Sequence, residues 1–491
     1  MSYTVPSIRI DPLNDRPTST DGRFVLYWMS SARRSGWNFA LDRALSHTKD
    51  RRCPLIVCET LACNSPWMNP RHANLIFDGM ADNAKAFKRA RIEYVPIVAS
   101  DSTRLARAIS AAAKHATVVV TDWDVLREPA ELADMVAQKC PVLAERVDSN
   151  GLLPLRATDR AYPTAHALRR FLQRVLPDHL ADFPSKAPSL PARFPKSDGL
   201  PVKQTKHCLI GFDSVSARGL ELVTRESANP QTLPVDLRGG STAARQVLKR
   251  FLNDRLPRYD TERNQPESDA SSGLSPYLHH GHISVFEVFA ELAHQQQWSP
   301  DRLADRATGS REGWWGMDSS AEAFLDELVT WREVGFNMCA HRQDYDTAES
   351  LPDWAQTTLN EHADDHRPYE YSFEEFRDGK THDDLWNAAQ RQLLKEGIVH
   401  NYLRMLWGKK ILEWTPDWPA ALETMIELNN TYAVDGCDPN SYSGIFWVLG
   451  RYDRAWGPQR PVFGKIRYMS SANTARKVRV RNYIAQHLET G

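Results

Sequence analysis

Phe24-Val25-Leu26-Tyr27-Trp28 is the stretch that decides the fold of the N-terminal region. It is a short apolar and aromatic run, which is typical of a strand buried on both faces of a parallel sheet. Three similar runs follow at residues 54–58, 94–98 and 117–121. Helical composition and spacing separate these runs, at residues 37–46, 72–91 and 102–115. This alternation predicts a doubly wound α/β domain with a parallel sheet.

The turn after the first strand argues against the usual dinucleotide site. A Rossmann domain carries GxGxxG at this point, so that its backbone can approach a pyrophosphate. Here the sequence is Trp28-Met29-Ser30-Ser31-Ala32. We therefore do not expect a dinucleotide bound in the Rossmann manner.

A proline-rich segment separates this region from the rest of the chain. Residues 177–234 contain 8 prolines in 58 residues and no sustained periodicity, which favours a long connector. Helical patterns dominate after it, at residues 243–256, 284–297, 321–342, 351–362, 373–379, 383–396 and 402–413. The predicted organisation is an N-terminal tail (1–22), an α/β domain (23–176), a connector (177–238) and an all-helical domain (239–491).

Length and composition limit the class of protein. The 491 residues suffice for two or three domains, at about 150 residues each. No run approaches the roughly 18 to 20 apolar residues of a membrane span, so we exclude a membrane protein. Residues 1–23 lack the apolar core of a secretion signal, and the 7 cysteines are an odd number, so we expect a cytoplasmic protein. The cysteines at positions 53, 58 and 63 lack the spacing of a zinc or iron–sulfur site, and we expect no metal.

The formal net charge of −1 hides a strong asymmetry. Residues 318–384 carry 18 acidic and 5 basic side chains, whereas residues 451–491 carry 9 basic and 2 acidic ones. Within the basic segment, residues 460–468 mix cations with aromatic rings, which favours a nucleic-acid backbone beside unstacked bases, or a solvated basic face. The near-zero average therefore does not exclude DNA as a partner.

Eleven of the 15 tryptophans lie from Trp298 onward. Trp407 and Trp414 are two helical turns apart, so they share a stripe, and Trp386 lies on the preceding predicted helix. Such a stripe is either core packing or a series of hopping sites for electrons, because indole is readily oxidised.

Three further segments carry candidate chemistry. Glu327 and Trp331 are four residues apart on one predicted helix, which suits a flat heterocycle or, equally, a boundary indole beside a solvated acid. The turn Ser271-Ser272-Gly273-Leu274-Ser275 precedes a helix and favours a phosphate or an ordinary N-cap. Residues 429–440 are turn-rich and contain Asp435 and Asp438, which indicates a plain loop or a cation site without calcium-loop spacing.

Together these segments closely resemble the photolyase/cryptochrome family, and within it the class II cyclobutane pyrimidine dimer photolyases. The resemblance covers about residues 239–483, and more loosely Tyr27-Trp28-Met29-Ser30. Its most specific pieces are Gly273-Leu274-Ser275-Pro276-Tyr277-Leu278-His279, Leu385-Trp386-Asn387-Ala388-Ala389-Gln390, Leu403-Arg404-Met405, Lys409-Lys410-Ile411-Leu412-Glu413-Trp414 and Phe463-Gly464-Lys465-Ile466-Arg467-Tyr468-Met469.

The resemblance implies a U-shaped FAD in the helical domain, active in its fully reduced anionic form. Residues that would bind its phosphates are Tyr259, Ser271, Ser272, Gly273, Leu274 and Ser275. Arg404 and Asp435 would pair beside the isoalloxazine ring, and Asn429 would lie near flavin N5. The α/β domain would hold an antenna chromophore, a deazaflavin or a folate, to which the sequence assigns no residues.

The resemblance also implies light-driven splitting of pyrimidine dimers in ultraviolet-damaged DNA, a carbon–carbon lyase reaction. Trp331 and Trp447 would clasp the flipped-out dimer while Glu327 hydrogen-bonds its carbonyl, since a stacked base cannot reach the flavin. The DNA-binding residues would be Arg263, Lys465 and Arg467. Trp386, Trp407 and Trp414 would form the photoreduction chain. We expect a monomer without an obligate protein partner.

Several positions depart from the family pattern and leave alternatives open. His279-His280-Gly281-His282 stands where the family usually has His-Phe-Gly-Gln, Cys437 replaces an Arg, and residues 452–456 are Tyr-Asp-Arg-Ala-Trp instead of His-Asp-Gln-Gly-Trp. Leu406 and Gly408 replace the Tyr and Ala expected around Trp407. One alternative is a cryptochrome-like blue-light receptor without repair activity. The other is repair of a different lesion, with His280 and His282 as proton donors.

Overall fold

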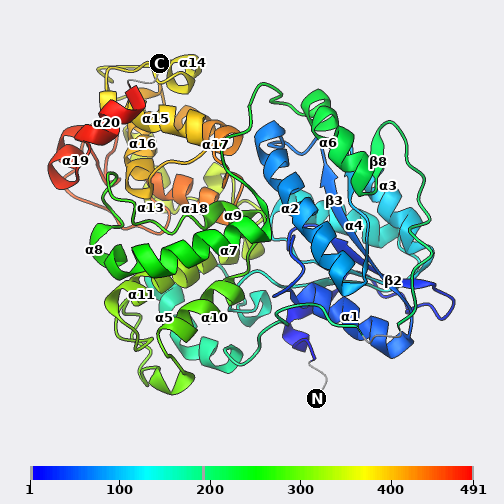
Figure 1. The fold of residues 1–491 in the computed structure, drawn as a ribbon. Coiled ribbons are helices and arrows are strands. Elements are labelled where there is room, and N and C mark those ends of the chain that lie inside the picture. Colours follow the sequence, from blue (N-terminus) through cyan, green and yellow to red (C-terminus); the bar gives the residue numbers. More distant parts are fainter. Residues whose placement is uncertain (1–3, 191–193, 489–491) are drawn as a thin grey trace. The chain divides into compact units, whose positions relative to one another are not determined.

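The structure is a computed structural model that describes residues 4–190 and 194–488. It divides into two compact units (Figure 1). Unit 1 comprises Met1–Asp159, Val175–Lys249 and Leu274–Asp301. Unit 2 comprises Arg160–Arg174, Arg250–Gly273 and Arg302–Gly491. The domain boundaries that the sequence suggests stay a prediction.

Unit 1 is built on one sheet with the strand order β1-β7-β6-β2-β3-β5-β8, and β4 pairs with β3. Its strands are β1 (Ile10–Pro12), β2 (Phe24–Met29), β3 (Leu55–Ala62), β4 (Glu93–Tyr94), β5 (Ile97–Ala99), β6 (Ala116–Asp122), β7 (Ala144–Val147) and β8 (Cys208–Ile210). The inner pairs are parallel, and only β1 and β8 run antiparallel to their neighbours among the described strands. The predicted doubly wound sheet is confirmed.

Helices cover both faces of this sheet, so every residue of β2 is buried. They are α1 (Phe39–Arg51), α2 (Pro70–Ala90), α3 (Ser102–Ala113), α4 (Arg127–Lys139) and α6 (Phe212–Glu226). Phe24, Leu26 and Trp28 share one hydrophobic cluster with residues of α3 and α4, while α1 packs against β2 and β6. Burial on two faces explains why the strand has no polar alternation.

The predicted connector contains structure that its composition conceals. Strand β8 pairs with β5 at the edge of the sheet, and α6 follows directly. Leu222 and Val223 of α6 are buried in a cluster with residues of α2. One narrow apolar stripe is enough to dock a helix, and such a stripe is a weak signal among prolines and charges.

The remaining helices confirm the helical second half. The three that complete unit 1 or join it to unit 2 are α7 (Gly240–Arg250), α9 (Ser275–His279) and α10 (Val285–Gln295). Unit 2 contains α5 (Ala165–Val175, whose last residue falls in unit 1), α8 (Tyr259–Glu262), α11 (Ser319–Leu325), α12 (Arg332–His341), α13 (Asp353–Glu361), α14 (Phe373–Arg377), α15 (Asp384–Glu396), α16 (Asn401–Trp414), α17 (Trp418–Tyr432), α18 (Pro439–Val448), α19 (Ser471–Lys477) and α20 (Arg481–Leu488). Within the described ranges, none of the helices has the length and apolar character that a bilayer span requires.

The helix predicted over residues 321–342 is not uniform. A π-helical turn, Asp326–Trp331 (η7), separates α11 from α12. Such turns insert one extra residue and occur often at functional sites. Glu327 and Trp331, the predicted site residues, both lie in this turn.

Candidate functional site

In the π-helical turn, the carboxylates of the adjacent residues Asp326 and Glu327 have different partners. Asp326 is buried and accepts two hydrogen bonds from Arg169, at 2.7 and 3.1 Å, which anchor the turn. Glu327 instead forms an ion pair with Arg263, and about a third of its side chain stays exposed. Burial raises the pKa of Glu327, and the Arg263 guanidinium opposes that rise. One acid therefore holds the turn while its neighbour remains available to a ligand.

Arg263 links residues that the sequence analysis assigned to three different roles. Its guanidinium pairs with Glu327 and lies 5.6 Å from the centre of the Tyr259 ring. Tyr259 is itself buried against Phe251 and Phe324. Predicted DNA, lesion and cofactor residues thus form one contiguous cluster in unit 2.

A second cluster surrounds Trp447 on α18. The Arg467 guanidinium lies 5.5 Å from this indole and 4.1 Å from Trp456, and its Nε donates to Asp453 at 2.8 Å. The carboxylate of Asp453 therefore fixes the guanidinium between two indoles, which would hold a phosphate-binding group in one orientation.

Lys409 lies beside the predicted lesion residue Trp447, a proximity that the sequence did not predict. It is fully buried on α16, its Nζ lies 5.0 Å from the Trp447 ring, and it donates to the carbonyl of Val448 at 2.5 Å. Burial lowers its pKa to about 7. The available signal was the pair Lys409-Lys410 within the otherwise apolar residues 406–412, where a buried charge is costly unless it has a local partner.

Two ring contacts join the three predicted electron-chain indoles. Trp386 of α15 lies parallel to Trp407 with ring centroids 6.4 Å apart, and meets Trp414 edge-on at 6.0 Å. The Trp386 Nε1 donates to the carbonyl of Trp407, and the Trp407 Nε1 donates to Gln390. All three rings are buried. Trp386 thus occupies the middle of the array, between two residues that share one helix.

The predicted flavin residues on α16, on α17 and just after α17 form a set of polar groups that fits a flavin nucleotide. Arg404 pairs with Asp435 at 3.0 Å, and both side chains keep some exposure. Asn429 is buried and donates to the side chain of Asn430. The buried Nδ1 of His400, one helical turn before Arg404, has no hydrogen-bond partner among the described residues. A guanidinium, an amide and an unpartnered imidazole nitrogen match a ligand that carries phosphates and a polar heterocycle.

Most of the remaining predicted binding residues are exposed. Ser271, Gly273 and Ser275 are exposed, Ser272 is half-buried and Leu274 is buried. Gly273 adopts φ +69°, in the region that favours glycine, and the predicted helix begins at Ser275. Lys465 is exposed, and its backbone N–H donates to Thr358. Their roles toward phosphates stay predictions.

The structure shows the local environment of four positions that depart from the family pattern, Cys437, Tyr452, His280 and His282. Cys437 adopts φ +64° and its backbone N–H donates to the Asn430 side chain at 3.0 Å, so the turn closes without an arginine. Tyr452 is buried with its hydroxyl 3.4 Å from Ser443. Burial lowers the pKa of His282 to about 3 and that of His280 well below its usual range. Both are neutral near pH 7, which argues against a role as proton donors.

Three consecutive backbone N–H groups after β2 form a nest, which is a site that can bind an anion. The carboxylate of Asp122 occupies it. The Asp122 Oδ2 accepts from the backbone N–H groups of Ser30, Ser31 and Ala32, each at 2.9 Å. The Tyr27 hydroxyl donates to its other oxygen at 2.7 Å. In a Rossmann domain a pyrophosphate would accept these bonds. The internal acceptor agrees with the sequence-based exclusion of that site.

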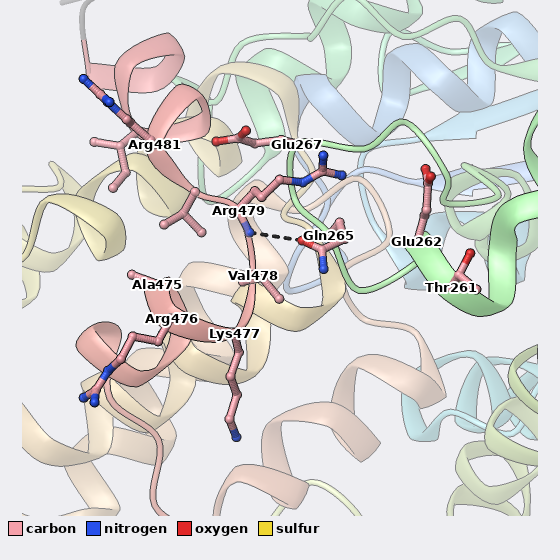
Figure 2. Close-up of a pocket in the computed structure, with 12 residues that line it drawn as sticks. Thr261, Glu262, Gln265, Glu267, Ala475, Arg476, Lys477, Val478, Arg479 and Arg481 are labelled. Atoms are coloured by element: carbon pink, nitrogen blue, oxygen red, sulfur yellow. Dashed lines mark hydrogen bonds between the residues drawn. The ribbon is translucent and has the colours of Figure 1, made fainter.

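A cavity of about 760 Å³ lies in the basic C-terminal segment of unit 2 (Figure 2). Residues 475–481 line one side and residues 261–267 the other. The Arg479 backbone N–H donates to Gln265 at 3.0 Å, and Glu267 accepts from the backbone of Asn482. In Figure 2, Arg476 and Lys477 point away from Glu262 and Glu267, and both side chains are exposed.

The chain has close relatives among curated proteins, although no protein-family model matches it. The Methanothermobacter thermautotrophicus deoxyribodipyrimidine photo-lyase is 33% identical over 478 residues, which cover 97% of this chain and 97% of the relative. The Potorous tridactylus enzyme of the same name is 32% identical and covers 93% and 80%. The Arabidopsis thaliana enzyme is 31% identical and covers 94% and 88%.

Solved structures share the fold at lower identity. A class III photolyase from Agrobacterium tumefaciens has a TM-score of 0.65 at 17% identity, covering 97% of this chain and 88% of that one. A Synechocystis cryptochrome has a TM-score of 0.68 at 15% identity, covering 95% and 88%. The Sulfolobus tokodaii photolyase, solved with two FAD molecules, has a TM-score of 0.66 at 14% identity, covering 95% and 90%. The fold and the near-full-length relatives lead to one conclusion: the chain belongs to the deoxyribodipyrimidine photolyase family.

Proposed function

We propose that this enzyme uses light to split cyclobutane pyrimidine dimers in DNA, as a photolyase of class II. The observation that carries the proposal is the array Trp407–Trp386–Trp414, three buried indoles in direct contact. Packing alone needs no such chain of rings, whereas a light-driven enzyme needs a supply of electrons to its chromophore. The residues predicted to hold the lesion lie in the same unit, in the turn Asp326–Trp331.

FAD is the cofactor that fits the donor set of α16 and α17. Arg404 and Asp435 would bind beside its ring system, and the amide of Asn429 would hydrogen-bond the flavin edge. Tyr259 and the turn at residues 271–275 would hold its phosphates. When bound in its fully reduced anionic form, FAD supplies the photoexcited electron that opens the cyclobutane ring and is then returned. An antenna deazaflavin or folate in unit 1 remains a separate prediction.

The side chains of unit 2 would position the flipped-out lesion. Trp331 and Trp447 offer flat apolar surfaces to the pyrimidines, and Glu327 offers a carboxyl group to a carbonyl oxygen. Because burial raises the pKa of Glu327, its protonated form, a hydrogen-bond donor, is more accessible than for a solvated acid. Arg263 keeps this carboxyl group oriented in the absence of a ligand.

Cations would hold the DNA backbone. Arg263 and Arg467 are each oriented by a carboxylate, Glu327 and Asp453, and Lys465 is exposed. Outward-facing Arg476 and Lys477 extend the positive surface. Such contacts confer affinity without reading base sequence. We further propose that the enzyme acts as a monomer in a reducing cytoplasm, which agrees with its odd number of cysteines.

The decisive experiment is repair in light against darkness. The full-length chain, reconstituted with FAD and chemically reduced, is mixed with an oligonucleotide that contains one thymine dimer. We expect recovery of thymine absorbance under blue light and none in darkness. An oligonucleotide with a (6–4) photoproduct is the control for lesion class. Photoreduction of the flavin without any repair would favour a blue-light receptor and contradict the proposal.

A further inference from the structure

Three histidines from distant parts of the sequence meet in unit 1, and none of them is among the residues proposed above to bind FAD or DNA. His72 is the third residue of α2, and His279 and His280 lie at the end of α9. Each offers one ring nitrogen, and the three nitrogens lie within 4.8 Å of one another. Nitrogens bound at about 2.0–2.1 Å to a tetrahedral metal are ~3.4 Å apart, so small side-chain rotations would complete the geometry.

The backbone that carries these histidines is held in place. Gly281 adopts φ +71°, and a Cβ there would lie 1.8 Å from the carbonyl oxygen of Ser31, so the turn fits closely against the segment after β2. The Arg34 Nη1 donates to the Gly281 carbonyl at 3.1 Å. On the other side, the Asn69 side chain accepts from the His72 backbone N–H at 3.2 Å. A metal site gains affinity when its ligands start from such fixed positions.

His282 belongs to the same turn but has a different partner. Its Nδ1 accepts from the Gly240 backbone N–H at 3.0 Å, and its carbonyl accepts from the Ser241 hydroxyl at 2.7 Å. Its ring stacks on His280 with centroids 5.7 Å apart. His282 therefore packs against His280 and is not one of the three residues whose ring nitrogens converge.

Charge and burial restrict which metal ions this site would bind. Arg33 acts on His280 through its positive charge, and its Nη1 pairs with the buried Glu59 at 3.3 Å, which offsets that charge. His72 and His280 are buried, whereas His279 is half-buried and leaves one side accessible to water. Neutral imidazoles prefer Zn²⁺, Co²⁺, Ni²⁺ or Cu²⁺ over the oxygen-loving Mg²⁺ and Ca²⁺.

We propose that His72, His279 and His280 bind one divalent transition-metal ion of the Zn²⁺ class, with water as its fourth ligand. The ion would join α2 to the turn after α9, two segments about 200 residues apart in sequence. Its role would be structural, because no predicted flavin or lesion residue is among the ligands. The competing explanation is a packed cluster of aromatic rings, since the centroids are 4.6 to 6.5 Å apart.

Zinc binding to the tag-free, FAD-containing full chain distinguishes the two explanations. The protein is stripped with a chelator, titrated with ZnCl₂ and passed over a desalting column, and its metal content is measured by mass spectrometry. We expect one zinc per chain and an increased melting temperature. In His280→Phe, which carries the residue usual in the family, we expect at least about tenfold weaker binding because one of three protein ligands is lost.

His282→Gln is the matched control, because it alters the neighbouring histidine and should retain the zinc. Flavin absorbance and circular dichroism establish that each variant is folded, and His279→Gln replaces His280→Phe if the latter fails to fold. Cu²⁺ gives an independent readout, since nitrogen hyperfine structure in its electron paramagnetic resonance spectrum reports imidazole ligands. Absence of zinc in the wild-type chain, or equal binding in the ligand variants, would overturn the proposal.

Discussion

The indole rings of Trp386 and Trp407 are nearly parallel: the angle between their planes is 2°, and their centroids are 6.4 Å apart. Trp386 also touches Trp414, so it is the one member of the array in contact with both others. We predict that Trp386→Phe slows photoreduction of the flavin more than Trp414→Phe does, because it interrupts the array in the middle. Transient absorption of the flavin after a light pulse measures this rate.

Repair by chemically reduced Trp386→Phe enzyme should stay near the wild-type level, because the array is bypassed. Trp418→Phe is the control, since this buried indole donates to Asn360 and lies outside the array. Equal loss of photoreduction and repair in Trp386→Phe would contradict an electron-transfer role. The substitution leaves a smaller ring in the core and costs up to about 3 kcal/mol of stability. The measurements should therefore be made at temperatures below the unfolding transition of the variant.

We predict that Glu327→Gln lowers the efficiency of dimer splitting and leaves photoreduction unchanged. The amide keeps the size of the side chain but cannot pair with Arg263 as an ion or act as an acid. Since both side chains of the pair are partly exposed, the loss of stability should be no more than about 1 kcal/mol. Repair per absorbed photon is the measurement, and Glu361→Gln, exposed on α13, is the control. Undiminished repair in Glu327→Gln would exclude the lesion contact.

Lys409 makes stability depend on pH in a known direction. Its pKa is about 7 in the folded chain, against 10.5 ordinarily. Between these values the unfolded chain binds a proton that the folded chain does not, so this group adds to the unfolding free energy as pH increases from 7 to 10.5. Buried thiols such as Cys58 and Cys63, whose pKa values burial raises, act in the opposite direction. The contribution of Lys409 is at most about 5 kcal/mol. Relative to the wild-type chain, Lys409→Met should therefore lose stability progressively between pH 7 and pH 10.5 in chemical denaturation series.

Lys410→Met provides the comparison for this experiment. It removes the same charge from the next residue, whose Nζ pairs with Glu413 at 2.7 Å, and leaves Lys409 intact. The pH dependence of stability between pH 7 and pH 10 should therefore match that of the wild-type chain in this variant. A pH dependence in Lys409→Met that also matches the wild type would show that this ammonium does not contribute.

We predict that Asp122→Ala destabilises unit 1 by at least about 2 kcal/mol, because three backbone N–H groups lose their acceptor. Asp124→Ala removes a carboxylate that accepts from the Leu126 N–H, and it should cost about 1 kcal/mol. Urea denaturation followed by circular dichroism compares the two. A smaller effect for Asp122 than for Asp124 would contradict the importance of the nest.

Arg476 and Lys477 should contribute to DNA affinity through charge alone. In the double variant Arg476→Ala/Lys477→Ala, the slope of log affinity against log salt concentration should decrease by up to about 2, at ~0.9 per phosphate contact. Lys85→Ala/Lys88→Ala changes the charge equally on the exposed surface of α2 in unit 1. Fluorescence anisotropy with undamaged DNA at several salt concentrations measures both slopes. Identical slopes for the two double variants would place the DNA elsewhere.

The strands and most long helices were predictable because their signals are local. The apolar run of β2 is buried on both faces, and the proposed helices over residues 102–115, 383–396 and 402–413 correspond to α3, α15 and α16. Helix α6 escaped prediction because it docks through a few residues such as Val223 amid polar neighbours. The π-helical turn of Asp326–Trp331 escaped as well, since one inserted residue does not alter the apolar pattern.

The amino-acid sequence by itself determined the alternation of the first strands and helices, the family resemblance and the types of residue at the site, because apolar periodicity and motif spacing are properties of neighbouring positions. Only the tertiary structure decided that Trp386 lies between Trp407 and Trp414. It also decided that Arg263 pairs with Glu327 and that the Lys409 ammonium lies against the Trp447 ring. The meeting of His72 with His279 and His280 also required it. These relationships join side chains from separate elements, and packing and desolvation, which depend on the whole fold, set their distances and charges.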